Sequence, residues 1–140
     1  MQEPAHLSGT DVIRIVKSLG FPIGSYVVFS GSTLAVHGIR ETSDVDIVCT
    51  PELFAQCKAE GWTEYPKSDG SHYLKRADVE LCTEVRCAGL LLTAEELIAR
   101  AEVIDGIALA SLEDVKAFKK AYGRAKDLMD LVFIDAYLAQ

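Results

Sequence analysis

The chain has 140 residues, of which 49% are hydrophobic and 25% charged, a globular composition that disfavours a disordered chain. This length is typical of one domain, so we expect a single domain over residues 1–140. Fourteen basic and 21 acidic residues give a formal net charge of −7. This charge argues against a broad nucleic-acid-binding surface, because neutralising a phosphate backbone requires clustered lysine and arginine.

The sequence carries no targeting signal that we can identify. The first ten residues lack a basic segment followed by an apolar run, and no stretch approaches 18 consecutive apolar residues. We therefore expect no secretory signal, no membrane span and a cytoplasmic location. The four cysteines form no Cys-x-x-Cys pair and are expected to be reduced, buried thiols.

Helices and strands alternate in the first part of the chain. Apolar residues at helical spacing predict a helix over residues 11–19 that Thr10 caps. A short apolar run predicts a buried strand over residues 26–29, and a short helix is expected over 32–37. Alternating polar and apolar residues predict a strand over 43–49.

Capping and turn residues set the expected elements of the middle segment. Thr50 followed by Pro51 predicts the start of a helix that runs to about Glu60. The elements expected next are a strand over 62–65, a turn over 66–71, and either one long strand or two bent strands over 72–76 and 78–86.

The last third is expected to be mainly helical. Thr93 and Glu96 form a predicted capping box, and Asp105-Gly106 predicts a tight hairpin. Ser111 is expected to start a helix that ends at about Tyr122. A last helix is amphipathic and is expected to pack across the sheet. The whole pattern predicts an α/β or α+β fold with a small mixed sheet flanked by helices.

Two aspartates lie two positions apart in the expected strand 43–49. Alternate residues of a strand point to the same face, so Asp44 and Asp46 should lie side by side, with Val45 and Ile47 facing the core. Neighbouring carboxylates repel each other unless a cation lies between them. Mg²⁺ usually binds one or two carboxylates together with substrate phosphates. The spacing is therefore typical of a magnesium site.

A glycine and a serine lie between the expected strand 26–29 and the helix that follows. Gly31 permits a turn and lets a phosphate approach the backbone. Helix N-terminal amides and the Ser32 hydroxyl can hold phosphate oxygens. Each pattern alone is common, but a phosphate-binding turn next to a metal-binding carboxylate pair indicates phosphoryl or nucleotidyl transfer.

The motifs can be compared with a known superfamily. Gly31-Ser32 is followed by Leu34-Ala35-Val36-His37-Gly38, then by Arg40, Thr42 and Asp44-Val45-Asp46. This order resembles the nucleotidyltransferase superfamily with the DNA polymerase β-type fold. It is closest to the small bacterial branch of AbiEii-like toxins and minimal nucleotidyltransferases. A lysine-bearing helix followed by Gly123-Arg124 and Lys126-Asp127 is similar to the same branch. The two matches span residues 26–49 and 111–131.

The resemblance implies a catalytic metal centre that binds Mg²⁺, with Mn²⁺ as the alternative ion. Asp44 and Asp46 would be catalytic metal ligands. The superfamily adds a third carboxylate on a later strand, which shares one metal and activates the acceptor hydroxyl. The candidates here are Asp78 and Glu80, and Glu80 is preferred because it lies further inside its strand.

The resemblance also implies a nucleoside triphosphate site. Gly31 and Ser32 would hold the triphosphate. Lys126 could reach it as a point cation, or could pair with Asp130 on an exposed helix. Arg40 could contact phosphate or pair with a nearby acid.

We therefore expect a Mg²⁺-dependent nucleotidyltransferase that moves a nucleoside monophosphate from a nucleoside triphosphate to a hydroxyl acceptor. A tRNA end, a protein side chain and a small molecule all remain open as acceptors. A chain this short leaves little room for an acceptor-binding domain, so a protein partner or a second copy is a candidate source of that site. The alternative is a noncatalytic nucleotide-binding or toxin–antitoxin interaction module on the same fold.

Overall fold

A seven-stranded mixed sheet forms the centre of the computed structural model, which describes residues 6–140. The prediction of no secretory signal rests partly on residues 1–5, which lie outside the described residues. The strands of the described chain are β1 (Tyr26–Phe29), β2 (Val45–Cys49), β3 (Thr63–Pro66), β4 (His72–Arg76), β5 (Val79–Cys82), β6 (Glu84–Cys87), β7 (Leu90–Thr93), β8 (Glu102–Ile104) and β9 (Ile107–Leu109). Its helices are α1 (Gly9–Leu19), α2 (Gly31–Val36), α3 (Pro51–Ala59), α4 (Ala94–Ala99), α5 (Leu112–Tyr122) and α6 (Ala125–Leu138).

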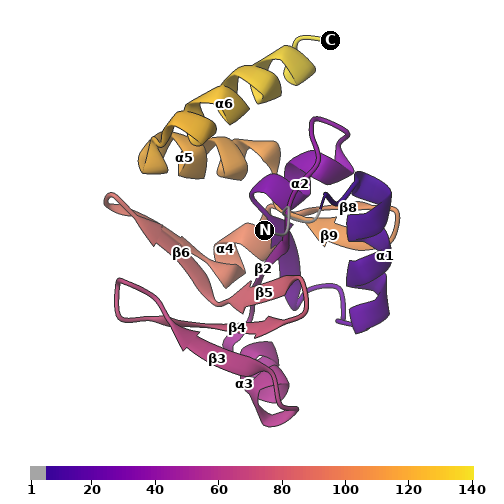
Figure 1. Ribbon diagram of the computed structural model, residues 1–140, viewed down its shortest axis with the longest axis vertical. Helices are drawn as coiled ribbons and strands as arrows, with labels where there is room; N and C mark the ends of the chain where they lie inside the picture. The colour runs from indigo at the N-terminus through magenta and orange to yellow at the C-terminus, as the bar shows by residue number, and fades with distance from the viewer. Residues whose placement is uncertain (1–5) are drawn as a thin grey trace, which may run out of the picture.

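Across the large sheet the strands follow the order β3-β4-β5-β2-β1-β9-β8 (Figure 1). Strand β2 is parallel to β5, and β1 is parallel to β9, whereas the other neighbours are antiparallel. The predicted α/β class with a mixed sheet is therefore confirmed. Within residues 6–140 no helix is long and apolar enough to cross a membrane.

Alternate residues of the central strands supply two hydrophobic clusters, one on each face of the sheet. On one face Val28 and Ile47 pack with residues of α1 and α3. On the other face Val27 and Val48 pack with residues of α4, α5 and α6. Asp46 lies two residues before Val48 and therefore belongs to this second face. The candidate site is thus on the side of the sheet that the C-terminal helices cover.

Three local features differ from the sequence-based predictions. Helix α1 begins at Gly9 and is capped by Ser8 rather than Thr10, because the side chains of Ser8 and Asp11 each bond the other's backbone N–H. The strand expected over 78–86 is divided into β5 and β6, which belong to different sheets. Strand β7 was not predicted; it pairs with β6 across a turn in which Ala88 and Gly89 both have positive φ.

All four cysteines are free thiols, as expected. Cys49 and Cys57 are buried, and burial raises the pKa of Cys49 to about 12. Cys82 and Cys87 are only half-buried. The prediction of buried thiols therefore applies to the first pair alone.

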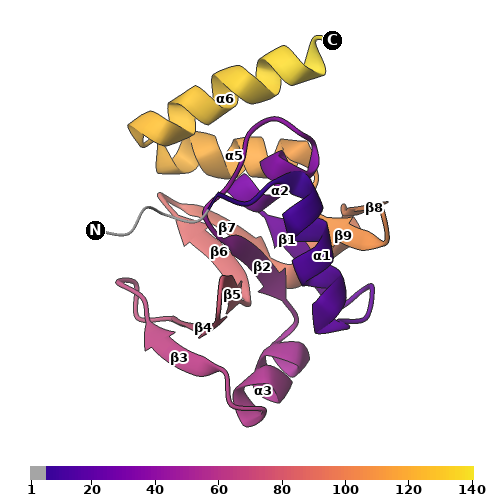
Figure 2. The same ribbon diagram turned by 45° about the vertical axis from the view of Figure 1, so that its right-hand side comes forward.

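Helix α6 packs on α5 and forms the outermost layer of the molecule, as Figure 1 and Figure 2 show. Its contact with the sheet face runs through Ile134, which joins the cluster that contains Val27 and Val48. Its buried residues are Asp127, Asp130 and Ile134, so the side that faces inward carries two acids. The apolar residues left outside are Leu128, Met129, Val132, Phe133 and Leu138.

A network of buried charges fixes the orientation of α6. The Arg40 guanidinium donates two hydrogen bonds to the Asp130 carboxylate, at 2.7 and 2.8 Å. The Lys119 ammonium lies 3.0 Å from Asp130 and 3.2 Å from Asp127, and Arg124 closes the network on Asp127 at 2.7 Å. Burial alone would raise the pKa of Asp130, but the hydrogen bonds from Arg40 and Lys119 hold it below its ordinary value. The network ties α5 and α6 to the loop before β2.

We predict that Asp130→Asn lowers the free energy of unfolding by about 3 kcal/mol, because it leaves Lys119 and Arg40 without their shared buried anion. Urea unfolding at pH 7 measures this change. Asp135→Asn is the matched control: Asp135 lies on the same helix and pairs with Lys116 at 2.9 Å, but its side chain is 64% exposed. Its loss should cost less than ~1 kcal/mol. Equal costs for the two variants would show that the buried network does not hold the helix.

Candidate functional site

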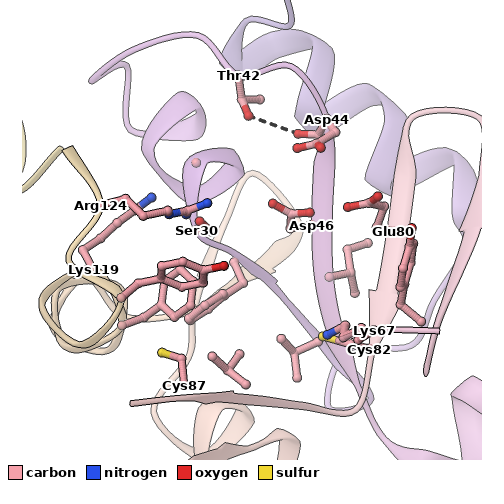
Figure 3. A pocket seen from close by; sticks show the side chains of 18 of the residues that line it. Ser30, Thr42, Asp44, Asp46, Lys67, Glu80, Cys82, Cys87, Lys119 and Arg124 are labelled. Carbon is pink, nitrogen blue, oxygen red and sulfur yellow. Dashed lines mark hydrogen bonds between the residues drawn. The ribbon is translucent and has the colours of Figure 1, made fainter. Parts of the chain in front are cut away.

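Three carboxylates meet where β2 and β5 run side by side. Asp46 on β2 lies directly across from Glu80 on β5, and Asp44 immediately precedes β2. Each of the three offers one oxygen, and these oxygens all lie within 4.8 Å of one another. Figure 3 shows Asp46 and Glu80 pointing toward each other from the two strands, with Asp44 close by. Such a set of oxygens matches what a hard divalent cation requires.

Burial and the close approach of the carboxylates change the acidity of the two aspartates. Burial, followed by the charges of Asp44 and Glu80, raises the pKa of Asp46 to about 8. Burial and the charge of Glu80 also raise the pKa of Asp44, which the positive charges of Lys75 and Lys126 partly oppose. Asp46 therefore keeps a proton near neutral pH unless a cation joins the carboxylates.

The structure places Asp78 away from this centre. Asp78 is an exposed residue in the turn between β4 and β5, and it is not among the three acids whose oxygens converge. Its charge still acts weakly on Asp44. Of the two candidates for the third carboxylate, Glu80 is therefore the one that joins the aspartates.

Ser32 has a different role from the one expected of its hydroxyl. The side chain is fully buried; its hydroxyl donates to the Asp44 carbonyl at 2.9 Å and accepts from the Asp46 amide at 2.9 Å. The hydroxyl proton is thus not available to a phosphate. Instead Ser32 fixes the backbone of both aspartates to the start of α2. Any contact of Ser32 with a triphosphate must come from its backbone amide, in the first turn of the helix.

Gly31 lies directly beneath the Arg40 guanidinium. A methyl group at Gly31 would be 2.9 Å from Nη2 of Arg40 and 3.2 Å from the Thr42 hydroxyl. The guanidinium is held in this position by Asp130. Glycine is therefore needed at position 31, because a larger residue would collide with Arg40. The Arg40 guanidinium covers the turn that was expected to hold phosphate.

Ser30 is a feature that the sequence did not indicate. Its backbone has φ 59° and ψ −134°, a conformation that costs a residue with a side chain ~1–3 kcal/mol. It lines the cleft immediately before Gly31, and Figure 3 places it beside Lys119 and Arg124. Residues with strained backbone conformations are common at active sites and ligand-binding segments.

Positive side chains surround the carboxylates. Lys126 is exposed, lines the cleft and forms no ion pair with any other described residue, so the pairing with Asp130 that was left open is not present. Arg124 stacks over Tyr122 at 3.8 Å. Lys119, by contrast, is 2% exposed and fully engaged by the two acids of α6. Lys126 is thus the lysine of this segment that remains available.

These groups line one cleft of about 1030 Å³. Its lining comes from the start of α2, the carboxylates of β2 and β5, the α5–α6 junction, the β6–β7 hairpin and the turn between β3 and β4. Figure 3 shows Lys119 and Arg124 on one side of the carboxylates and Lys67 with Cys82 on another. A cleft of this size is large enough for a nucleotide.

Comparison of the chain with models of protein families, with curated proteins and with solved structures gives no match.

We predict that the metal-free protein loses stability as the pH rises from about 4 to about 8. In this window folded Asp46 keeps a proton that the unfolded chain releases, so unfolding becomes more favourable with pH. The slope for one proton is at most about 1.4 kcal/mol per pH unit. Urea unfolding in a chelator at several pH values measures it. Asp46→Asn should remove most of the slope and Asp78→Asn should retain it; an unchanged slope in Asp46→Asn would contradict the assignment.

We also predict that Gly31→Ala destabilises the protein by ~1–3 kcal/mol, because the new methyl group displaces the Arg40 guanidinium. The same substitution should cost less in an Arg40→Ala background, since contacting residues are not additive. A double-mutant cycle by urea unfolding measures this coupling. Equal costs in the two backgrounds would mean that Arg40 is not the obstacle.

Proposed function

We propose that the protein is a Mg²⁺-dependent nucleotidyltransferase, which moves a nucleoside monophosphate from a nucleoside triphosphate to a hydroxyl acceptor. The observation that carries the proposal is the convergence of Asp44, Asp46 and Glu80 within 4.8 Å, in a cleft that is also lined by Lys67 and Lys126, neither of which pairs with an acid among residues 6–140. A purely structural protein has little reason to hold three repelling carboxylates together.

Asp44, Asp46 and Glu80 are the residues that would hold the metal. Bound Mg²⁺ supplies positive charge that offsets the carboxylates and the triphosphate and makes the acceptor hydroxyl more acidic. The raised pKa values of Asp44 and Asp46 support this proposal, because a site that binds a proton in the absence of metal is one that a cation stabilises. Mn²⁺, which also accepts oxygen ligands, is the alternative ion.

The phosphate side of the cleft is formed by the start of α2 and the α5–α6 junction. Arg40 presents its guanidinium above Gly31, and Asp130 holds it in place without neutralising it by proton transfer. Lys126 reaches the same cleft from α6. Together they can bind the oxygens of the triphosphate and offset the negative charge that develops on the leaving group.

In the chemical step the acceptor oxygen attacks the α-phosphorus and forms a new P–O bond. The bond from the α-phosphorus to the oxygen that bridges it to the β-phosphate breaks, and pyrophosphate leaves. Glu80 accepts the proton of the acceptor hydroxyl, because β5 lies nearer than β2 to the β3 edge of the sheet, which makes Glu80 the outer carboxylate of the facing pair Asp46 and Glu80. Arg40 and Lys126 bind the pyrophosphate as its charge increases.

Calorimetric titration of each of the four nucleoside triphosphates, with and without Mg²⁺, tests the proposal. We expect at least one to bind only with Mg²⁺, and Asp44→Ala/Asp46→Ala to weaken this binding by ~100-fold or more, beyond the loss typical of outer-shell partners. Asp78→Asn is the matched control, since it removes a neighbouring exposed carboxylate, and should bind as the wild type does.

Two results would contradict the proposal. Nucleotide binding that survives in Asp44→Ala/Asp46→Ala would show that the metal ligands are assigned wrongly. Failure of the wild type to bind any of the four nucleotides would favour a noncatalytic interaction module that uses the same fold. Glu80→Gln adds a readout for chemistry, because it should weaken Mg²⁺-dependent binding less than Asp44→Ala/Asp46→Ala does and reduce pyrophosphate release more than Asp78→Asn does.

A further inference from the structure

The exposed apolar side chains of the described chain are concentrated on one helix. Residues 6–140 leave ten large hydrophobic side chains exposed, and five of them belong to α6: Leu128, Met129, Val132, Phe133 and Leu138. Apolar side chains scattered singly over a surface are ordinary, whereas a contiguous group of them marks an interaction site. The concentration on a single helix of 14 residues therefore requires an explanation.

Helical spacing gathers the outward side chains of α6 on one face. Leu128, Met129, Val132 and Ala136 recur at intervals of three and four residues, all four are exposed, and none is ionised. We call these four residues the outer α6 face. The buried acids and Ile134 occupy the opposite side of the helix. Helix α6 is also the outermost layer of the molecule, so no other described element covers this face (Figure 1, Figure 2).

The order of side-chain sizes along this face suits a second copy of the chain in the antiparallel direction. A two-fold axis beside Val132 pairs this residue with Val132 of the second copy, and it exchanges positions that are equally far from Val132. Leu128 of one copy then lies opposite Ala136 of the other. A large side chain thus meets a small one at both ends, which allows the two helices to pack closely.

A parallel pairing would be a poorer fit. It would place Leu128 against Leu128 at one end and Ala136 against Ala136 at the other. The first contact is crowded and the second leaves a gap, and both defects destabilise a packed interface.

The charges around α6 favour the same antiparallel direction. The exposed basic residues Lys120, Arg124 and Lys126 lie at or just before its start. Its C-terminal half carries no basic residue, and Asp135 there is 64% exposed although it pairs with Lys116. An antiparallel pair brings the basic start of one helix toward the acidic end of the other, and the partial charges of the helix ends are also complementary.

We propose that the outer α6 face binds the same face of a second copy of this chain, antiparallel and about a two-fold axis at Val132. Helices α5 and α6 already pack together within one copy (Figure 1). The dimer therefore places four helices between two sheets, with the two α6 helices in contact at its centre. Symmetric pairing through one self-complementary surface is the commonest form of oligomer.

The dimer would also extend the wall of the cleft. Met129 belongs to the outer α6 face and lines the cleft, and Lys126 lines the cleft one turn before it. A second copy on this face lies along the rim of the cleft as a result. The inference does not depend on the proposed function, because it follows from the surface of α6 alone.

The length of α6 limits the strength of this dimer. Fourteen helical residues extend over about 21 Å. A pairing of two such helices buries less than the ~1,600 Å² of a standard interface. We therefore expect a dimer that dissociates in the micromolar range rather than an obligate one.

Sedimentation velocity of the full chain, from about 1 to about 200 µM, tests the proposal. We expect the mass to rise with concentration toward twice the 15.3 kDa of one chain. Val132→Glu should weaken association at least ~10-fold, because it brings two acids together at the two-fold axis. Val132 is 61% exposed in one copy, so this change should leave the fold intact, which urea unfolding of the dilute protein checks.

Val103→Glu is the matched control. It makes the same substitution on β8, at a side chain that is 57% exposed, and adds the same negative charge. It should associate as the wild type does. Equal weakening by the two substitutions would show that net charge, rather than contact through α6, controls the association, and would overturn the proposal.

Mixtures of two variants test the symmetry and direction of the pair. Val132→Glu mixed with Val132→Lys should form a heterodimer, although each variant alone stays mainly monomeric, because opposite charges then meet at the axis. Leu128→Glu mixed with Ala136→Lys should associate more tightly than either variant alone. Only the antiparallel arrangement brings these last two positions together, so a second mixture without rescue overturns that arrangement.

Two further results would overturn the proposal. A wild type that stays monomeric at every concentration would leave the outer α6 face to a different partner. Association that Val132→Glu does not weaken would place the contact on another surface. These measurements use no nucleotide, so either result leaves the proposed function as it stands.

Discussion

Asp44, Asp46 and Glu80 repel one another, so the rest of the chain has to fix their backbone and supply compensating positive charge. Left to themselves, carboxylates this close would move apart or keep protons. The backbone gives them no freedom to separate, because two of them lie in register on adjacent strands and the buried Ser32 hydroxyl is bonded to the backbone of both aspartates. The fold therefore holds the three carboxylates together. The raised pKa values of Asp44 and Asp46 reflect their burial and mutual repulsion.

Compensating charge comes from distant parts of the sequence. The last two helices place acids inward, and these acids hold Arg40 and Lys119 beside the cleft. This arrangement explains why α6 turns its apolar residues outward. A helix chosen for packing alone would have buried Leu128 and Val132, but the partners of Arg40 and Lys119 have to be on the inner side. Stabilising the cleft thus takes precedence over burying this apolar surface.

The sequence was a good guide where structure is local. Period-two alternation placed Asp44 and Asp46 on one side of β2 and predicted their proximity, and capping residues correctly placed the start of α3 and α5. It was a poor guide where partners are far apart in the chain. The contact between Arg40 and Asp130 spans 90 residues and has no periodicity that a local pattern could reveal.

The same limit explains the remaining differences. The apolar residues of a helix can face either the core or the outside of the molecule. The orientation of α6 therefore could not be predicted from its own residues. The hydroxyl of Ser32 was expected to hold a phosphate, yet its partners lie 12 residues later, just before β2, and 14 residues later, within β2. The stacking of Tyr65 on Tyr73 depends on the register of β3 with β4, which is set by a turn whose exact geometry the residue types left open.

The partners in the charge network are synthesised at different times, and this determines when the cleft is completed during translation. Residues emerge from the ribosome in sequence, so the glycine turn and all three carboxylates become exposed before α6 has been synthesised. Until Asp130 follows, Arg40 has no anion to hold it over Gly31, and the nascent chain has the acids of the cleft without its assembled cationic side. Translation thus delays completion of the cleft until α6 has been made.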